Sequence, residues 1–101
     1  MTDDQSKLSN LRQEIDKIDE KLIQIIAKRR GISAKIGMYK EENSLSIVQR
    51  KREKSALKKR IKQEKKLGIK KRFTKRLFRL IFCDSRKVQK HPRGFDKKPK
   101  N

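Results

Sequence analysis

The sequence predicts an all-α fold of three helices, one long and two shorter, completed by a second copy of the chain in an intertwined helical homodimer. Apolar residues recur every three or four positions from residue 8 to residue 40, which is the spacing of one helix face. Two further stretches with helical spacing follow, and the sequence has no alternating strand pattern, internal repeat or glycine-rich phosphate loop. With 101 residues, 32% hydrophobic content and no Trp, the chain makes one domain with a thin core, which favours self-association.

The first predicted helix spans residues 8–40, with Ser6 or Ser9 as its N-terminal cap. Its apolar stripe consists of Leu8, Leu11, Ile15, Ile18, Leu22 and Ile25. The next position on this stripe is Arg29, and Lys40, eleven residues later, returns to nearly the same face at about 100° per residue. A cation in a packed seam needs an anionic counterpart, so these two residues predict an anion-binding wall.

The second and third predicted helices are shorter. Ser46 and Gln49 resemble a capping box for a helix that runs to residue 67, where Gly68 supplies a left-handed C-terminal cap. The third helix covers residues 70–89 and turns five apolar side chains toward the core: Phe73, Leu77, Leu80, Ile81 and Val88. Ser85 and Gln89 follow Ile81 at steps of four, which places two polar groups on this apolar side.

The domain boundaries follow from where these patterns stop. We expect a helical domain over residues 1–90 and a disordered basic tail over residues 91–101, because Pro92 and Gly94 interrupt the helical pattern and the remainder is polar and rich in lysine.

The length of the first helix predicts the dimer. Residues 8–40 span roughly 50 Å at 1.5 Å per residue, which is longer than a domain of this size is wide. The ends of the helix therefore protrude, and a second copy of the chain can cover them.

Charge is distributed unevenly along the chain. Of its 32 basic and 12 acidic residues, 23 basic and 4 acidic ones lie beyond residue 45. This excess is compatible with a polyanionic partner, an anionic substrate or a general preference for lysine, and composition does not choose among them.

Other classes of protein are disfavoured by single residues. Cys83 is the only cysteine and His91 the only histidine, so the chain offers no intrachain disulfide and too few ligands for a zinc site, and we expect no metal or cofactor. The N-terminus is polar and acidic, unlike a signal peptide, and no apolar run is long enough to span a membrane. These features indicate a cytoplasmic protein with no membrane partner.

The dispersed polar residues resemble a known site. The run LRQEIDKIDEKLIQIIAKRR, the lysine at Lys40, the RE pair at Arg52 and Glu53, and the run RLFRLIFCDSRKVQ are similar to the all-α (AroQ) class of chorismate mutase. The resemblance extends from about residue 8 to residue 89 without a gap. It implies a homodimeric isomerase that rearranges chorismate to prephenate, a Claisen-type pericyclic step in the biosynthesis of Phe and Tyr.

The resemblance also implies roles for individual residues in holding the dianionic substrate. Arg29 and Ser85 would bind one carboxylate. Lys40 would bridge the other carboxylate and the breaking ether oxygen, and Gln89 would donate to the same oxygen. These donors would stabilise charge that develops in the transition state.

Four further residues complete the site that the resemblance implies. Glu53 would accept a hydrogen bond from the ring hydroxyl, and Arg52 would orient Glu53. Arg12 lies seventeen residues before Arg29, roughly 25 Å along the helix, so it would serve the site of the partner subunit. Gln49 departs from the Asp that similar enzymes often carry, and because the family uses the backbone here we expect this change to be tolerated.

Several alternatives remain open on the sequence. The chain could be a related chorismate-utilising enzyme, either an isochorismate-pyruvate lyase or an aminodeoxychorismate mutase, although Glu53 weighs against the lyase. It could instead be a basic helical nucleic-acid-binding protein, which is less favoured because no stacking platform or base-reading motif accompanies the charge. It could also be a relative that has lost activity, against which the intact polar set argues. Some relatives are fused to a dehydratase or dehydrogenase, and here we expect a free-standing enzyme.

Overall fold

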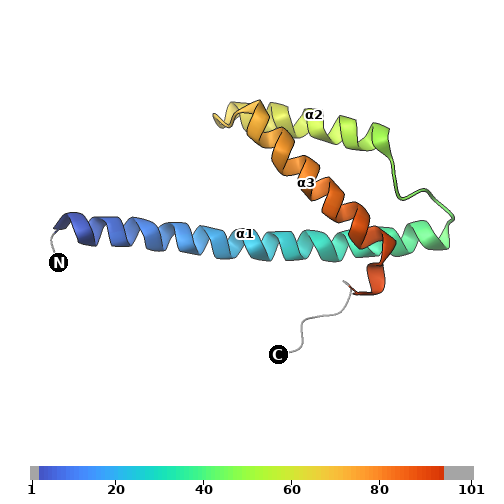
Figure 1. Cartoon of the computed structure of the whole chain (residues 1–101), viewed down its shortest axis with the longest axis horizontal. Coiled ribbons are helices and arrows are strands. Elements are labelled where there is room, and N and C mark those ends of the chain that lie inside the picture. Colours follow the sequence, from blue (N-terminus) through green and yellow to red (C-terminus); the bar gives the residue numbers. More distant parts are fainter. Residues whose placement is uncertain (1–2, 95–101) are drawn as a thin grey trace.

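A computed structural model describes residues 3–94, which form three α-helices and one short 3-10 turn. The helices are α1 (Asp3–Glu42), α2 (Arg50–Lys66) and α3 (Lys71–Lys90), and the turn is η1 (Pro92–Gly94). Figure 1 shows α3 running diagonally from the end of α2 down to the C-terminal half of α1, so the three helices outline an open wedge. The all-α prediction, with one long helix and two shorter ones, is confirmed for this part of the chain.

Helix α1 begins earlier than predicted. It starts at Asp3, so Ser6 and Ser9 lie inside the helix and the prediction that one of them caps it is wrong. Asp3 and Asp4 occupy the first turn, where negative side chains interact favourably with the helix dipole. The helix is 40 residues long, which corresponds to about 60 Å at 1.5 Å per residue.

Helices α1 and α2 end in the same backbone motif. The N–H of Leu45 donates to the carbonyl of Lys40 at 2.8 Å and the N–H of Ser44 to that of Glu41 at 3.3 Å, with Ser44 in the left-handed region at φ 53°. At the end of α2, Ile69 and Gly68 make the corresponding bonds and Gly68 has φ 80°. Both ends are Schellman motifs. The predicted glycine cap of the second helix is thus confirmed.

The predicted capping box of α2 is wrong. The hydroxyl of Ser46 donates to the carbonyl of Val48 at 3.1 Å, and α2 begins after Gln49 with no side-chain cap. The segment between α1 and α2 is therefore held by the turn that closes α1.

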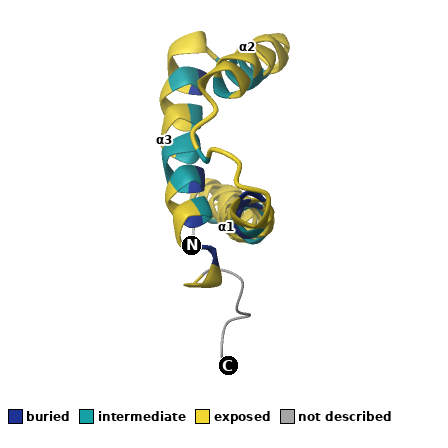
Figure 2. Ribbon diagram, turned by 90° about the vertical axis from the view of Figure 1, so that its right-hand side faces the viewer, coloured by how far each residue is buried: buried dark blue, intermediate teal, exposed yellow. Residues whose placement is uncertain are grey.

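Helix α3 lies between the other two helices and contacts both. Helices α1 and α3 approach closely at Gly37, where a Cβ atom would lie 2.5 Å from the carbonyl oxygen of Gln89. Ala34 and Val88 are fully buried at this crossing, and Thr74 is buried where α3 meets α2, with its hydroxyl bonded to the carboxylate of Glu64. Figure 2 shows buried residues on the inner side of α3, on the facing part of α1 and in η1.

One chain alone buries very little apolar surface. Ala34 and Val88 are the only hydrophobic residues that count as buried in the described part, whereas the predicted stripe of α1 is exposed throughout. Phe73, Leu77 and Leu80 of α3 are also exposed, so the prediction that they face the core is wrong for the single chain. The radius of gyration is 17.9 Å, against about 13 Å for a compact domain of this length.

The described chain continues past the predicted end of the domain. Pro92 is buried and η1 packs against α1, so the first residues of the predicted tail belong to the folded unit. The rest of the predicted tail, residues 95–101, lies outside the described residues.

Candidate active site

A polar cavity of ≈ 230 Å³ lies where the three helices face one another. All three contribute to its lining, as does the segment between α1 and α2. Seven of the eight site residues predicted from the sequence line it: Arg29, Lys40, Gln49, Arg52, Glu53, Ser85 and Gln89. The packing of the three helices thus brings together residues up to 60 positions apart in the chain.

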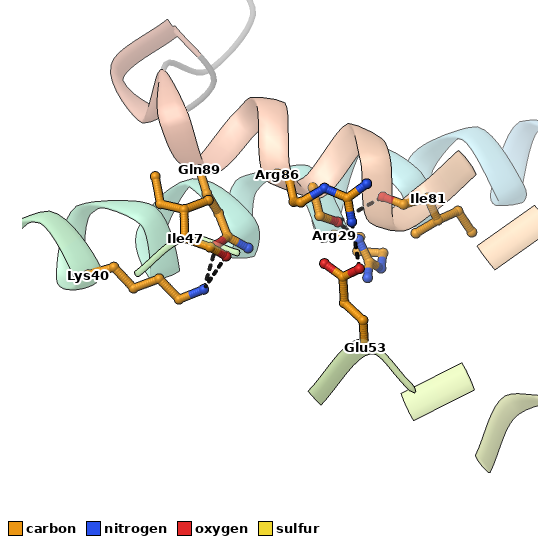
Figure 3. A network of polar contacts seen from close by, with 8 residues as sticks. Arg29, Lys40, Ile47, Glu53, Ile81, Arg86 and Gln89 are labelled. Carbon is orange, nitrogen blue, oxygen red and sulfur yellow. Dashed lines mark hydrogen bonds and ion pairs between the residues drawn. The ribbon is translucent and has the colours of Figure 1, made fainter. Parts of the chain in front are cut away.

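Lys40 sits at the end of α1 where the Schellman turn folds the chain back. Its ammonium group donates to the amide oxygen of Gln89 at 2.7 Å and to the carbonyl oxygen of Ile47 at 3.2 Å, as Figure 3 shows. An ammonium has three donors, so one hydrogen remains for a ligand. The bond to the amide oxygen also fixes the NH₂ group of Gln89 as the part of that side chain that can donate.

Burial lowers the pKa of Lys40 below its ordinary value of 10.5. The positive charge of Arg52 lowers this pKa further, and the carboxylate of Glu53 partly offsets both effects. The residue keeps only 9% of its surface exposed. Because both hydrogen-bond partners of Lys40 are neutral oxygens, they leave its buried positive charge unneutralised, which favours a bound anion.

Arg29 and Ser85 hold each other across the α1–α3 crossing. The guanidinium of Arg29 donates to the Ser85 hydroxyl, which in turn donates to the carbonyl of Ile81 at 2.9 Å. The single hydrogen of Ser85 is therefore engaged, and the hydroxyl orients Arg29. Burial lowers the pKa of Arg29, and Asp84 opposes this effect.

Glu53 is paired with Arg86, a residue that the sequence analysis did not single out. The Arg86 guanidinium donates to a Glu53 carboxylate oxygen at 2.5 Å, and both side chains are 23% exposed. The bond to Glu53 raises the pKa of Arg86. Arg86 lies three residues before Gln89 and four after Phe82, so helical periodicity already placed it at the edge of the cavity-facing side of α3.

The prediction that Arg52 orients Glu53 is not supported by this geometry, because the ion pair that reaches Glu53 comes from α3. Arg52 lines the cavity and acts on Lys40 through its charge. Gln49 contributes from the N-terminal end of α2, where its carbonyl accepts the N–H of Glu53 at 3.1 Å. Arg12 lies on the exposed part of α1 and does not line the cavity of its own chain.

The rest of the lining adds charge and an apolar wall. Arg60 lines the cavity and also lies over the ring of Phe78, with its guanidinium carbon 6.0 Å from the ring centre. The apolar lining consists of Ile36, Ile47, Ala56, Phe78 and Phe82. Five cations and one carboxylate therefore surround a partly apolar space, which suits a small organic dianion that carries a hydrogen-bond donor.

Residues 3–94 offer neither a metal site nor a membrane-spanning helix. No group of three or more His, Cys, Asp or Glu side chains is placed there to hold a metal ion. No helix of the same part is long and apolar enough to cross a membrane.

Comparison with known proteins identifies relatives of this chain. Over 79 residues it is 38% identical to a bifunctional chorismate mutase/prephenate dehydratase of Buchnera aphidicola, which covers 78% of this chain and 20% of the relative. Over 62 residues it is 39% identical to the T-protein of Haemophilus influenzae, covering 61% of this chain and 16% of that protein. The chain thus spans a fifth or less of the length of these curated relatives. No solved structure gives a significant match.

The match to a family extends over most of the helical domain. The family model described as Chorismate mutase type II matches residues 11–90, which include α2, α3 and all but the first eight residues of α1. The matched range holds every residue that lines the cavity. The chain belongs to the chorismate mutase type II family.

Proposed function

We propose that this protein is a chorismate mutase that converts chorismate to prephenate in the cavity between α1, α2 and α3. The observation that carries the proposal is the convergence of Arg29, Lys40, Glu53 and Gln89 on one small cavity. Membership of the family supports the same activity, and the name of the Buchnera relative includes it.

The rearrangement needs a substrate held in one conformation and electrostatic stabilisation of its transition state. In a Claisen rearrangement a carbon–oxygen bond breaks as a carbon–carbon bond forms within one molecule, so no external nucleophile or proton transfer is needed. The protein must hold the enolpyruvyl side chain over the ring and place donors at the ether oxygen, where negative charge develops. The ammonium of Lys40 donates to the amide oxygen of Gln89 at 2.7 Å, which holds the two side chains together, so the remaining hydrogen of Lys40 and the NH₂ group of Gln89 can both donate to a single oxygen.

The two carboxylates and the hydroxyl of the substrate have their own partners in this proposal. Arg29, oriented by Ser85, binds one carboxylate, and Lys40 with Arg52 provides positive charge for the other. Glu53, held by Arg86, accepts a hydrogen bond from the ring hydroxyl. Each of these contacts is charge-assisted and therefore stronger than a contact between neutral groups.

We further propose that the active unit is a homodimer in which Arg12 enters the cavity of the partner subunit. The exposed apolar stripe of α1 and the exposed Phe73, Leu77 and Leu80 of α3 need a covering surface, and a second copy supplies one of matching character. Arg12 is roughly 25 Å along α1 from Arg29, so within one chain the two cannot share a ligand.

The test is turnover of chorismate with product identification, with isochorismate as a parallel substrate. We expect prephenate from chorismate. Lys40→Ala should lower turnover about a hundredfold or more, because such a donor contributes about 3 kcal/mol in the transition state. Lys35→Ala removes an exposed lysine outside the cavity and should leave the rate unchanged. Pyruvate release from isochorismate, or full activity of Lys40→Ala, would contradict the proposal.

A further inference from the structure

A second hollow lies between α2 and α3, adjacent to the candidate active site. Its volume is ≈ 420 Å³ and no residue of α1 lines it. The lining consists of Arg50, Glu53, Lys54, Leu57, Arg79, Phe82 and Arg86. Glu53, Phe82 and Arg86 line both spaces, so the ion pair between Glu53 and Arg86 forms the wall that separates them.

The charge in this hollow is not balanced by the protein. Four cations face one carboxylate, which leaves a formal excess of three positive charges. Arg50 and Lys54 lie one turn apart on α2, and Arg79 and Arg86 lie two turns apart on α3, so the cations form two facing pairs. Glu53 already accepts a hydrogen bond from Arg86 at 2.5 Å, so its negative charge mainly neutralises the Arg86 guanidinium.

The surroundings of the cations favour a bound anion over free solvent ions. Leu57 and Phe82 provide apolar walls, and an apolar wall strengthens the attraction between charges by excluding water. An oxyanion with several acceptor oxygens can take donors from both helices at once. Guanidinium groups are especially suited to this geometry because each offers paired N–H donors.

The hollow lies away from the surface that a partner subunit would cover. At about 100° per residue, Arg79 and Arg86 lie about 130° and 150° around α3 from the centre of the exposed stripe of Phe73, Leu77 and Leu80. A dimer that buries this stripe leaves the hollow open to solvent.

We propose that this hollow is a second anion site, which binds phosphate or a small metabolite that carries a phosphate-like oxyanion, and that the bound anion acts on Glu53 through Arg86. The binding itself is independent of the proposed mutase activity, whereas its effect on turnover rests on that activity. The anion competes with Glu53 for the Arg86 guanidinium. Glu53 then loses its charge-assisted partner and is less restrained at the substrate hydroxyl, so kcat/KM falls.

The binding test is a titration of the purified full-length protein with inorganic phosphate, followed by amide shifts in NMR, against chloride at equal ionic strength. We expect saturable shifts at residues of the hollow. The double variant Lys54→Ala/Arg79→Ala should weaken phosphate binding by about a hundredfold, because each of the two lost charge-assisted bonds is worth about tenfold. The matched variant Lys59→Ala/Arg76→Ala removes the same two residue types from exposed positions outside the hollow and should bind as the parent does.

Two results would overturn the second site. Equal weakening of phosphate binding in both double variants would mean that phosphate binds only through the general positive charge of α2 and α3. Loss of the shifts in Lys40→Ala, with retention in Lys54→Ala/Arg79→Ala, would place the phosphate in the candidate active site instead.

The coupling to Glu53 is tested with chorismate turnover in the presence of phosphate. We expect phosphate to lower kcat/KM of the parent and of Lys59→Ala/Arg76→Ala, and to leave Lys54→Ala/Arg79→Ala unaffected. Phosphate binding at the hollow without any effect on kcat/KM would overturn the coupling alone. Phosphate binding in a protein that does not turn over chorismate would contradict the proposed function and leave the anion site standing.

Discussion

The polar side chains of the cavity hold one another in pairs, and each pair joins α3 to another helix. Arg29 with Ser85 and Lys40 with Gln89 connect α1 to α3, while Glu53 with Arg86 connects α2 to α3. Side chains that are fixed in this way lose less freedom when a ligand binds, so the site is preorganised. Ser85 and Arg86 thereby contribute by orienting a neighbouring charge.

The lowered pKa of Lys40 predicts the pH dependence of the reaction. In the proposed mechanism the charged form of Lys40 is the donor, and this form is lost as the pH rises through a pKa below the ordinary 10.5. The value of kcat/KM, which reports the free enzyme, should therefore fall at a lower pH than an exposed lysine would give. A bound dianion raises the pKa of Lys40 again, so kcat should fall at a higher pH. Rate profiles above pH 7 would show this, and a kcat/KM that is constant up to 10.5 would contradict it.

Four of the eight site residues could be predicted from spacing, but their pairing could not. Arg29, Lys40, Ser85 and Gln89 break apolar stripes at helical intervals, and such breaks are visible in a sequence. The partner of Glu53 was different. Arg52 is its neighbour in sequence, whereas Arg86 becomes its neighbour only when α2 and α3 approach each other. Helical periodicity fixes the face of a residue and says nothing about the distance between two helices.

At the scale of the elements, helix C-terminal ends were better predicted than N-terminal ends. Gly68 marked the end of α2 correctly, because few residues other than glycine adopt the left-handed conformation at low cost. Ser44 adopts the same conformation at the end of α1, but a serine does not predict a left-handed residue from the sequence. The predicted caps at Ser6 and Ser9 are wrong because the helix already begins before them, at Asp3 and Asp4, whose negative charges favour the first turn of a helix. The predicted cap at Ser46 is wrong in the opposite sense, because α2 begins only after Gln49.

The two glycines of α1 provide a matched pair of variants. Gly37→Ala places a Cβ 2.5 Å from a backbone oxygen and 2.6 Å from the Cα of Gln89, so α1 and α3 must separate. We expect a loss of about 1–3 kcal/mol in the free energy of unfolding and reduced turnover, because Gln89 moves. Gly31→Ala meets no atom within 4 Å and should stabilise by up to about 1 kcal/mol through helix propensity.

Urea denaturation of both glycine variants and the parent measures these changes. The comparison isolates the close approach, since the two substitutions are chemically identical and lie on one helix. A Gly37→Ala protein as stable as Gly31→Ala would show that the crossing of α1 and α3 has room for a Cβ atom at Gly37.

At the scale of the whole molecule, the flat shape and the exposed apolar residues are the observations from which we propose the homodimer. The chain measures 62 × 39 × 15 Å, and Leu22 is 52% exposed in the middle of the apolar stripe of α1.

Leu22→Glu should convert a dimer into a monomer of 12.1 kDa with reduced helix content, because it introduces two charges, one from each chain, into the shared seam. Gln24→Glu adds the same charge to the opposite face and should remain dimeric. Light scattering coupled to size-exclusion chromatography measures the masses, and a monomeric parent would contradict the dimer.

A site shared between subunits makes a sharper prediction than the dimer itself. In the proposed homodimer each cavity takes Arg29 from one chain and Arg12 from the other. Arg12→Ala and Arg29→Ala should therefore each be inactive as homodimers, since each lacks a cation in both cavities. A heterodimer of the two has one cavity with both defects and one cavity with none. Mixing the two inactive proteins at equal amounts should then restore about a quarter of the parent activity, because random exchange makes half of the molecules heterodimers and each has one intact site of two.

The control for the mixing experiment uses two variants with defects in the same part of the site. Arg29→Ala mixed with Lys40→Ala should give no recovery, because both residues come from the same chain in each cavity and every cavity of the heterodimer keeps one defect. Subunit exchange is verified by mass in both mixtures with a tag on one variant. If exchange is complete and the Arg12→Ala mixture stays inactive, Arg12 acts within its own chain or not at all, and the arrangement of α1 in the dimer must differ from the one proposed. Recovery in the first mixture alone would establish that each active site is built from two chains.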